Sequence, residues 1–347
     1  MSRKSKRQTM HPALNKTRKW VIFRLSSLGD VVLTTGVIDF LSRECGLEMS
    51  VITREGLAPV FYGHPGIKRV QAMDPAEMGK NTWKKQCTEL VDRFSEHGLL
   101  DLHGTLRSGL LKLMWPGPCL CYPKMNLKRR LFRYLRDPVS RRSLLATNIP
   151  QRYFAAVGPP PEKEKLRPRI FLKENELEDA RQRLEKTGIN RTFVCIHPYA
   201  THPAKNWPQE NWLNFLARLE EKHIDWIVLG RDKNPLLTNH PRDLTNKTGL
   251  RETCALIALS GHLITPDSGP MHLGTGVETP VTALFGPTSR EWGFYPSGEN
   301  DRIVHLGLSC SPCTLHGRVG CRRDLACMRD IAPETVLRTV LDRLKGI

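Results

Sequence analysis

The stretch ITPDSGPMHLGTGVETPVTALFGP, Ile264–Pro287, decides the fold class of this chain. It predicts a short apolar strand, a helix that starts near Ser268, and a second apolar strand that ends in Gly-Pro. In open α/β sheets, ligands bind beyond the carboxyl ends of strands, where helices begin. Asp267, Ser268 and Gly269 occupy that position, and His272 follows one turn later. The free amides there suit a phosphate, and the alternative is an ordinary helix cap with an incidental histidine.

The same alternation of strand, turn and helix runs along both halves of the chain. WVIFRL (20–25) is an apolar run with β-branched residues and predicts a buried parallel strand, which SSLGD connects to a helix. Further strands are predicted at 49–53, 99–104, 192–198, 225–230, 262–266 and 280–286. This rhythm favours doubly wound α/β sheets with helices on both faces.

Two domains are expected, because 347 residues exceed the size of one ordinary domain. VGPPPEKEKLRPR (157–169) contains four prolines, which neither a helix interior nor a central strand accepts. We therefore expect a basic tail at 1–18, a first domain at 19–157, a linker at 158–168, a second domain at 169–332 and a C-terminal helix at 333–347.

The composition is that of a globular protein, with 39% hydrophobic and 25% charged residues. No apolar run approaches the ~20 residues that span a bilayer. The basic N-terminus has no apolar segment behind it and does not resemble a secretory signal, so a cytosolic protein with reduced cysteines is expected. The net charge of +18 attracts nucleic acid, anionic membranes or acidic substrates.

Much of this charge lies between Lys124 and Arg152, where nine cations accompany the single acid Asp137. The segment is either a solvated basic face or a mobile loop that meets a polyanion. A nucleic-acid-binding protein would account for the charge, but such a protein would leave the strand-end motifs unexplained.

Two more loops follow predicted strands and carry polar residues. In YATHPAKNWP (199–208), Thr201 offers a hydroxyl, and Lys205 offers a charge that can neutralise a diphosphate without a metal; a solvated surface lysine is the alternative. In SSLGD (26–30), Gly29 makes the turn and Asp30 opens the helix, where an ordinary cap is the alternative.

RLSSLGDVVLTTGVI, DLHGTLRSGL, HPYATHPAKNWP and TPDSGPMHLGTGVETPVTALFGPTS together resemble glycosyltransferase family 9, in order from about residue 19 to 340. The resemblance implies a GT-B fold, in which two Rossmann-like domains face each other across a cleft, with the donor nucleotide in the C-terminal one. It also implies an inverting, metal-independent transfer of L-glycero-D-manno-heptose from ADP-heptose to the inner core of lipopolysaccharide, with no cofactor.

Carried over by position, Asp30 matches the proposed catalytic base and Lys205 the lysine at the donor phosphates. Ser268, where threonine is more usual, forms the diphosphate turn with Gly269 and His272. The resemblance further implies donor contacts from Thr201, Asp232 and Asp267, with Asp232 near the ribose. The acceptor contacts that we expect are Ser27, Gly29, His103, Arg107, Lys128 and Arg129.

The partners implied are an ADP-sugar and an acidic inner-core acceptor, Kdo-lipid A or heptosyl-Kdo-lipid A. Arg107, Lys112 and the basic segment would hold the acceptor, and the basic N-terminus would meet the anionic cytoplasmic face of the inner membrane without insertion. No nucleic acid is expected. The alternatives are a relative that transfers another sugar, or a non-catalytic nucleotide-binding protein.

One cysteine cluster remains, in CSPCTLHGRVGCRRDLAC (310–327). The spacing of Cys310, Cys313, Cys321 and Cys327 is compatible with structural zinc, with reduced thiols as the alternative and no catalytic metal implied.

Overall fold

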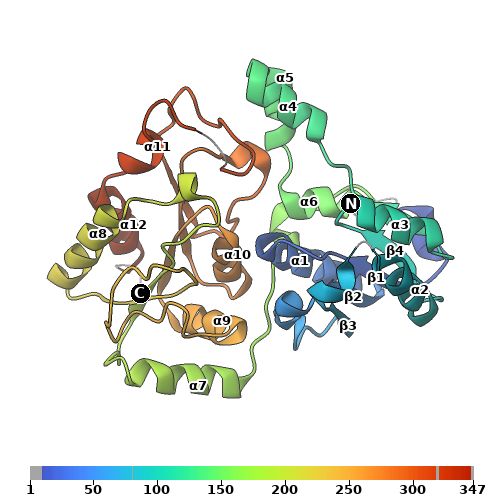
Figure 1. The fold of residues 1–347 in the computed structure, drawn as a ribbon, viewed down its shortest axis with the longest axis horizontal. Coiled ribbons are helices and arrows are strands. Elements are labelled where there is room, and N and C mark those ends of the chain that lie inside the picture. Colours follow the sequence, from blue (N-terminus) through green and yellow to red (C-terminus); the bar gives the residue numbers. More distant parts are fainter. Residues whose placement is uncertain (1–9, 80, 318–319, 345–347) are drawn as a thin grey trace, which may run out of the picture. The chain divides into compact units, whose positions relative to one another are not determined.

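The computed structural model describes residues 10–79, 81–317 and 320–344 (Figure 1). The chain divides into two compact units. The first contains the described residues up to Met125 together with Ile149–Arg167, and the second contains Asn126–Asn148 and the described chain from Pro168 onward. Each unit has its own five-stranded sheet. The predicted α/β class with two parallel sheets is confirmed.

The sheet of the first unit has the order β3-β2-β1-β4-β5, and all its pairs are parallel. From Trp20 onward β1 is fully buried, as its apolar run predicts. The strand order reverses beside β1, so the switch point of this sheet lies between β1 and β4. The strands are β1 (Lys19–Phe23), β2 (Glu48–Arg54), β3 (Ile67–Met73), β4 (Gly98–Asp101) and β5 (Cys119–Cys121).

Helices pack against this sheet. The helix α1 (Leu28–Cys45) follows β1 directly and ends at Gly46, whose φ of 63° lies in the left-handed region that suits glycine. The others are α2 (Trp83–Arg93), α3 (Leu106–Met114) and α6 (Ile149–Phe154), with short 3-10 helices at Pro12–Asn15, Glu55–Phe61, Pro75–Met78 and Lys163–Leu166.

The sheet of the second unit has the order β10-β9-β8-β6-β7, again all parallel. The order reverses between β6 and β8, which places the switch point of this unit there. The strands are β6 (Phe193–Ile196), β7 (Asp225–Val228), β8 (His262–Pro266), β9 (Val281–Phe285) and β10 (Arg302–His305).

The helices of the second unit bury a large aromatic core against the sheet. Trp207, Trp212 and Phe215 are almost fully buried, and Trp207 Nε1 donates a hydrogen bond to the Ile331 carbonyl at 3.0 Å. The helices are α4 (Asn126–Leu135), α5 (Pro138–Leu145), α7 (Glu174–Glu185), α8 (Gln209–Glu221), α9 (Leu250–Leu259), α10 (Gly269–Gly276), α11 (Ala326–Arg329) and α12 (Pro333–Leu344), with 3-10 turns at Pro203–Lys205 and Arg290–Trp292.

Three strands have no counterpart in the sequence prediction: β3, β5 and β10. Each lies at the edge of its sheet and is partly exposed along its length. An edge strand needs no continuous apolar run, so the pattern that marks the central strands is missing there.

The basic segment departs from expectation. In place of a mobile loop it forms α4 and α5, and residues 126–148 group with the second unit instead of the first. The physical reason is local: Asp137 accepts the Ser140 amide at 2.7 Å, and Pro138 occupies the first turn of α5, where a proline is tolerated.

The predicted tail and linker are partly folded. Residues 1–9 lie outside the described residues, but Ala13 and Leu14 are buried and the His11 amide bonds to the Val157 carbonyl at 2.7 Å. Leu166, inside the expected linker, is fully buried in the first unit. The C-terminal helix is present as α12, and residues 345–347 are outside the described part. No described helix is long and apolar enough to span a membrane.

At Gly36, α1 packs against the backbone of residues 166–167. A Cβ at Gly36 would overlap the carbonyl oxygens of Leu166 and Arg167, which belong to the backbone and cannot rotate away. Gly36→Ala should therefore lower the free energy of unfolding by about 2 kcal/mol. The matched control is Gly109→Ala in α3, where the Cβ meets nothing within 4 Å; it should raise that free energy by about 0.5 kcal/mol. Urea unfolding of both variants decides, and equal midpoints would contradict the packing argument.

Candidate active site

Asp30 lies in the first turn of α1, directly after the loop that leaves β1. Its Oδ2 accepts hydrogen bonds from the Ser27 amide at 3.2 Å and the Ser27 hydroxyl at 2.8 Å. Its Oδ1 is 2.5 Å from Arg24 Nη2 and accepts a hydrogen bond from Tyr153 Oη at 2.7 Å. Both carboxylate oxygens are therefore held in place, while about 15% of the side chain is exposed.

These contacts set the protonation state of the group. Burial raises the pKa of the Asp30 carboxyl, but the charge of Arg24 and hydrogen bonds from Tyr153 and Ser27 outweigh it, so the pKa lies below its ordinary value. Burial raises the pKa of Tyr153 well above its usual range, which keeps the phenol a donor at neutral pH. Asp30 is thus an anion that accepts hydrogen bonds at neutral pH.

His103 lies on the other side of the same switch point, after β4. Arg24 links the two strand ends, because its Nη1 donates to the Leu102 carbonyl. Burial, followed by the charge of Arg24, lowers the pKa of His103 to about 4, so the imidazole is neutral at neutral pH. Asp101 organises the turn by accepting the His103 amide at 2.9 Å and the Gly104 amide at 2.8 Å.

In the second unit, Lys205 and Asp267 meet at the ends of β6 and β8. Lys205 Nζ is 2.7 Å from Asp267 Oδ2 and 3.2 Å from the Asp267 carbonyl oxygen. Thr288, which follows β9, donates to Asp267 Oδ2 at 2.6 Å. Gly317 packs on the lysine, where an added Cβ would lie 3.0 Å from Lys205 Cγ. The ammonium is therefore fixed at the carboxyl ends of three neighbouring strands.

The turn after β8 leads into α10. Ser268 is the N-cap residue, yet its hydroxyl makes no capping hydrogen bond and pairs with Thr265 Oγ1 at 3.1 Å. The ordinary side-chain cap, which was the alternative, is not what the structure has. Gly269 begins the helix, and His272 is buried in its first turn with its ring 6.4 Å from that of Phe294.

Arg129 belongs to this neighbourhood. Its Nη2 donates to the Trp292 carbonyl at 3.2 Å, and its guanidinium lies 5.9 Å from the centre of the Phe294 ring. Lys128 is exposed and donates to Ser143 Oγ at 2.6 Å within the α4–α5 hairpin. Of the predicted acceptor contacts, these two lie in the second unit, whereas Ser27, Gly29, His103 and Arg107 lie in the first. Their roles toward an acceptor stay predictions.

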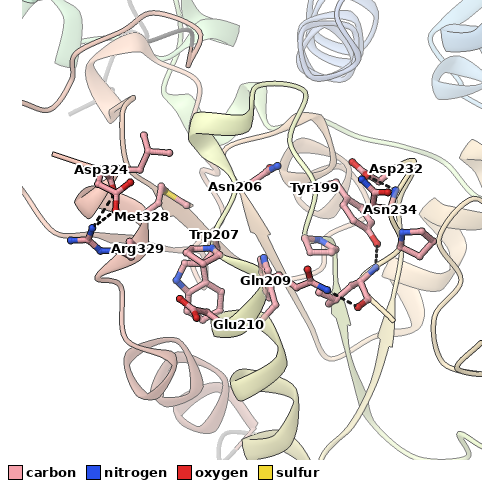
Figure 2. A pocket seen from close by; sticks show the side chains of 16 residues that line it. Tyr199, Asn206, Trp207, Gln209, Glu210, Asp232, Asn234, Asp324, Met328 and Arg329 are labelled. Carbon is pink, nitrogen blue, oxygen red and sulfur yellow. Dashed lines mark hydrogen bonds and ion pairs between the residues drawn. The ribbon is translucent and has the colours of Figure 1, made fainter. Parts of the chain in front are cut away.

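A groove of about 480 Å³ opens beside the ends of β6 and β7 (Figure 2). Tyr199 and Asp232 line one side of it, and Asp324 and Arg329 the other. Asp232 Oδ1 accepts the Asn234 amide at 2.8 Å. Among the predicted donor residues, Asp232 lines this groove, while Thr201, Lys205, Ser268 and His272 do not; Thr201 is exposed.

All ten cysteines are free thiols. Within the described residues, no group of three or more His, Cys, Asp or Glu side chains is placed to hold a metal ion. Cys310, Cys313, Cys321 and Cys327 all belong to that part of the chain, and burial followed by the charges of the other three thiols raises the pKa of Cys327 to about 11.

Three residues of the site have no counterpart in the sequence prediction. Arg24 lies inside the first apolar run, and its charge at such a position is the signal that marks it. Thr288 follows β9 and would have emerged from the same strand-end rule that found Asp267. Tyr153 is 123 residues from Asp30, and no local pattern marks it.

With this geometry in view, the family is identifiable. The sequence profile of glycosyltransferase family 9 (heptosyltransferase) matches residues 99–319, which is more than half of the chain. The chain belongs to glycosyltransferase family 9.

Two proteins of similar sequence are named as heptosyltransferases. Lipooligosaccharide heptosyltransferase 2 of Campylobacter jejuni is 36% identical over 169 residues, which cover 45% of this chain and 52% of that protein. The chain thus aligns with about half the length of this relative. Lipopolysaccharide heptosyltransferase 1 of Pseudomonas aeruginosa is 24% identical over 329 residues, 84% of this chain and 85% of that protein.

The fold has solved counterparts. The structure of the ADP-heptose LPS heptosyltransferase II of E. coli superposes with a TM-score of 0.70 at 20% identity, covering 94% of this chain and 99% of that one. At this identity the likeness concerns the fold, and the predicted GT-B class with two Rossmann-like units is confirmed.

The Arg24–Asp30 pair has a measurable pH signature. In the wild type, Asp30 has a lowered pKa, so its contribution to stability is present above the unfolded-state value and is lost only as pH falls through the lowered folded value. Arg24→Met should destabilise the protein by about 3 kcal/mol at pH 7. The pKa of Asp30 rises in the variant, so the difference in unfolding free energy should shrink as pH falls toward about 3.

The control is Arg24→Met in an Asp30→Asn background. There the part of the pH dependence that comes from the carboxyl should vanish, and what remains reports on His103, whose pKa the charge of Arg24 also lowers. Urea unfolding over this pH range measures both, and a pH-independent difference with Asp30 present would contradict the assigned coupling.

Proposed function

We propose that this protein is an inverting, metal-independent glycosyltransferase that moves L-glycero-D-manno-heptose from ADP-heptose to the inner core of lipopolysaccharide. Membership of family 9 and the heptosyltransferase names of the relatives support the reaction class. One observation carries the mechanism: a buried carboxylate held at both oxygens stands at one switch point, and a fixed ammonium beside a helix start stands at the other.

The second unit takes the donor diphosphate in this proposal. Lys205 lies where β6 and β8 end, and α10, whose first turn contains His272, begins there, so an anion gains both the lysine charge and the helix dipole. The Lys205 ammonium has three N–H donors, so it can keep Asp267 as a partner while it binds a phosphate oxygen. Asp267 and Thr288 then act as positioning residues for the lysine.

The first unit supplies the base. The acceptor hydroxyl oxygen attacks the anomeric carbon as the bond from that carbon to the diphosphate oxygen breaks, and the hydroxyl proton passes to Asp30. A carboxylate with a lowered pKa is a weak base, so this transfer comes late, when the attacking oxygen has become acidic. The leaving ADP gains negative charge in the same step, and Lys205 stabilises it more strongly than in the ground state.

For the acceptor we propose Kdo-lipid A or heptosyl-Kdo-lipid A, whose acidic sugars match the cationic character of the chain. Lipid A would hold the substrate at the cytoplasmic face of the inner membrane, where this enzyme would work by peripheral contact. A panel of ADP-sugars and of acceptors truncated at each inner-core sugar tests the donor and the acceptor separately.

The base is tested by Asp30→Asn. This change keeps the shape of the side chain and should leave ADP-heptose affinity within about threefold, while it lowers turnover by about 100-fold or more. Tyr153→Phe should act differently: it removes one hydrogen bond to the carboxylate, so the pKa of Asp30 rises and the acid limb of the kcat/KM profile moves to higher pH. Unchanged turnover in Asp30→Asn would remove this residue from the chemistry.

The donor site is tested by paired titrations with ADP and adenosine. His272→Ala should weaken ADP, and Lys205→Met should weaken it more, by about 100-fold, because a full charge is lost. Both variants should bind adenosine as tightly as the wild type does, because adenosine has no phosphate for these side chains to contact. Asp232→Ala is the contrasting variant, and it should weaken adenosine and ADP by the same factor. Equal losses of adenosine and ADP in Lys205→Met would mean that the loop is only structural.

A further inference from the structure

The α4–α5 hairpin turns its arginines toward its own unit. On α4, Arg129, Phe132 and Arg133 share one face at helical spacing, and Arg136 follows the helix directly. Arg133 Nε donates to the Cys313 carbonyl at 3.0 Å, and Arg136 Nη2 donates to the Cys310 carbonyl at 2.8 Å. Phe132 is buried with its ring 5.9 Å from that of Trp292. The cationic face of this helix is therefore its packed face.

The opposite face of the hairpin is apolar and exposed. Leu127, Tyr134 and Leu135 are each 70% exposed, with the partly buried Leu131 between them at the same helical spacing. Val139, in the first turn of α5, is 76% exposed. We call these five residues the outer face. Of the ten large apolar side chains that are exposed in the described chain, five lie between Leu127 and Leu145. An ordinary surface helix has the reverse pattern, with its apolar stripe toward the core.

Cations outnumber acids around the outer face in the described segment 126–148. Lys128, Arg130 and Arg142 are exposed, and Arg141 is exposed while it pairs with Glu291 at 2.9 Å. The one acid between residues 126 and 148, Asp137, accepts the Ser140 amide at the start of α5. Lys128 also bonds to Ser143, which ties the two helices together. The hairpin thus presents leucines, a tyrosine and a valine within a positive field.

We propose that the outer face of the α4–α5 hairpin binds an anionic lipid surface. Leucine and valine side chains gain free energy by entering the acyl boundary, and tyrosine suits the headgroup level. The flanking lysine and arginines add attraction to anionic headgroups. A nucleic acid would use the cations but not the leucines, and a second copy of the hairpin would bring its own cations against them. An anionic lipid surface accommodates both the exposed apolar side chains and the cations that flank them.

This inference goes beyond the proposed function and is tested without any sugar substrate. Lipid binding at the hairpin stands or falls separately from transfer at Asp30 and Lys205. If the proposed function holds as well, the hairpin would hold the donor-binding unit at the membrane that carries the acceptor.

The experiment is flotation of the full chain with vesicles of phosphatidylethanolamine that contain phosphatidylglycerol, against vesicles of phosphatidylcholine alone. The wild type should bind the anionic vesicles. The triple variant Leu127→Ser, Tyr134→Ser, Leu135→Ser should bind them about 10-fold or more weakly. Arg130→Ser and Arg142→Ser should each weaken binding about fivefold at low salt.

A matched control removes exposed leucines elsewhere in the same unit. Leu213 and Leu306 are 40% and 41% exposed, and the variant with serine at both positions should float like the wild type. Circular dichroism and urea unfolding establish that every variant is folded, so a loss of binding reports on the surface.

Several outcomes overturn the inference: a triple variant that floats like the wild type, a Leu213/Leu306 variant that loses as much, or a wild type that binds neither vesicle. Light scattering tests the other possible occupant of the outer face, a second copy of this chain. A wild-type dimer that the triple variant dissociates, with flotation unchanged, would assign the outer face to a second copy of this chain.

Discussion

The buried ion pair between Arg24 and Asp30 is the contact on which the chemistry of the first unit depends. Removing two charges from water is costly, and apolar replacements of such pairs are often as stable or more so, so stability alone does not account for it. What the pair provides is a carboxylate that stays ionised while buried. The same guanidinium reaches the Leu102 carbonyl, so one side chain sets the charge of Asp30 and joins the ends of β1 and β4. Structure and reactivity are coupled at a single residue.

The second unit solves a related problem with the opposite charge. Lys205 must keep its ammonium at a strand end before any phosphate arrives, and Asp267 holds it there at 2.7 Å. Thr288 shares the same carboxylate oxygen, which restricts how far Asp267 can turn. Residues after β6, β8 and β9 therefore act together, although 62 positions separate Lys205 from Asp267 and 21 separate Asp267 from Thr288. Parallel strands make this possible, because their carboxyl ends meet at one edge of the sheet.

How far the sequence predicts this arrangement depends on whether the information is local. Central strands such as β1 and β8 are continuous apolar runs, and the residues after them, Asp30 and Asp267, follow from the strand-end rule. Three of the four edge strands, β3, β5 and β10, lack that run, and the sequence does not predict them. Tyr153 reaches Asp30 from a helix 123 residues away, and only the fold brings them together. The charge of the segment 126–148 predicts a basic face or a mobile loop, whereas the spacing of Phe132, Arg133 and Arg136 has a helical period.

The hairpin also shows why a net charge is a poor guide to a partner. Of the 53 lysines and arginines, several form hydrogen bonds or ion pairs with other groups of the protein. Arg129, Arg133 and Arg136 donate to backbone carbonyls, and Arg251 pairs with Glu176 at 2.5 Å. Such cations complete hydrogen bonds that would otherwise be left open in the interior, so part of the net charge stabilises the fold. An extended anionic surface meets the exposed remainder. In the hairpin that remainder stands beside leucines, and it is this combination that distinguishes a lipid surface from other polyanions.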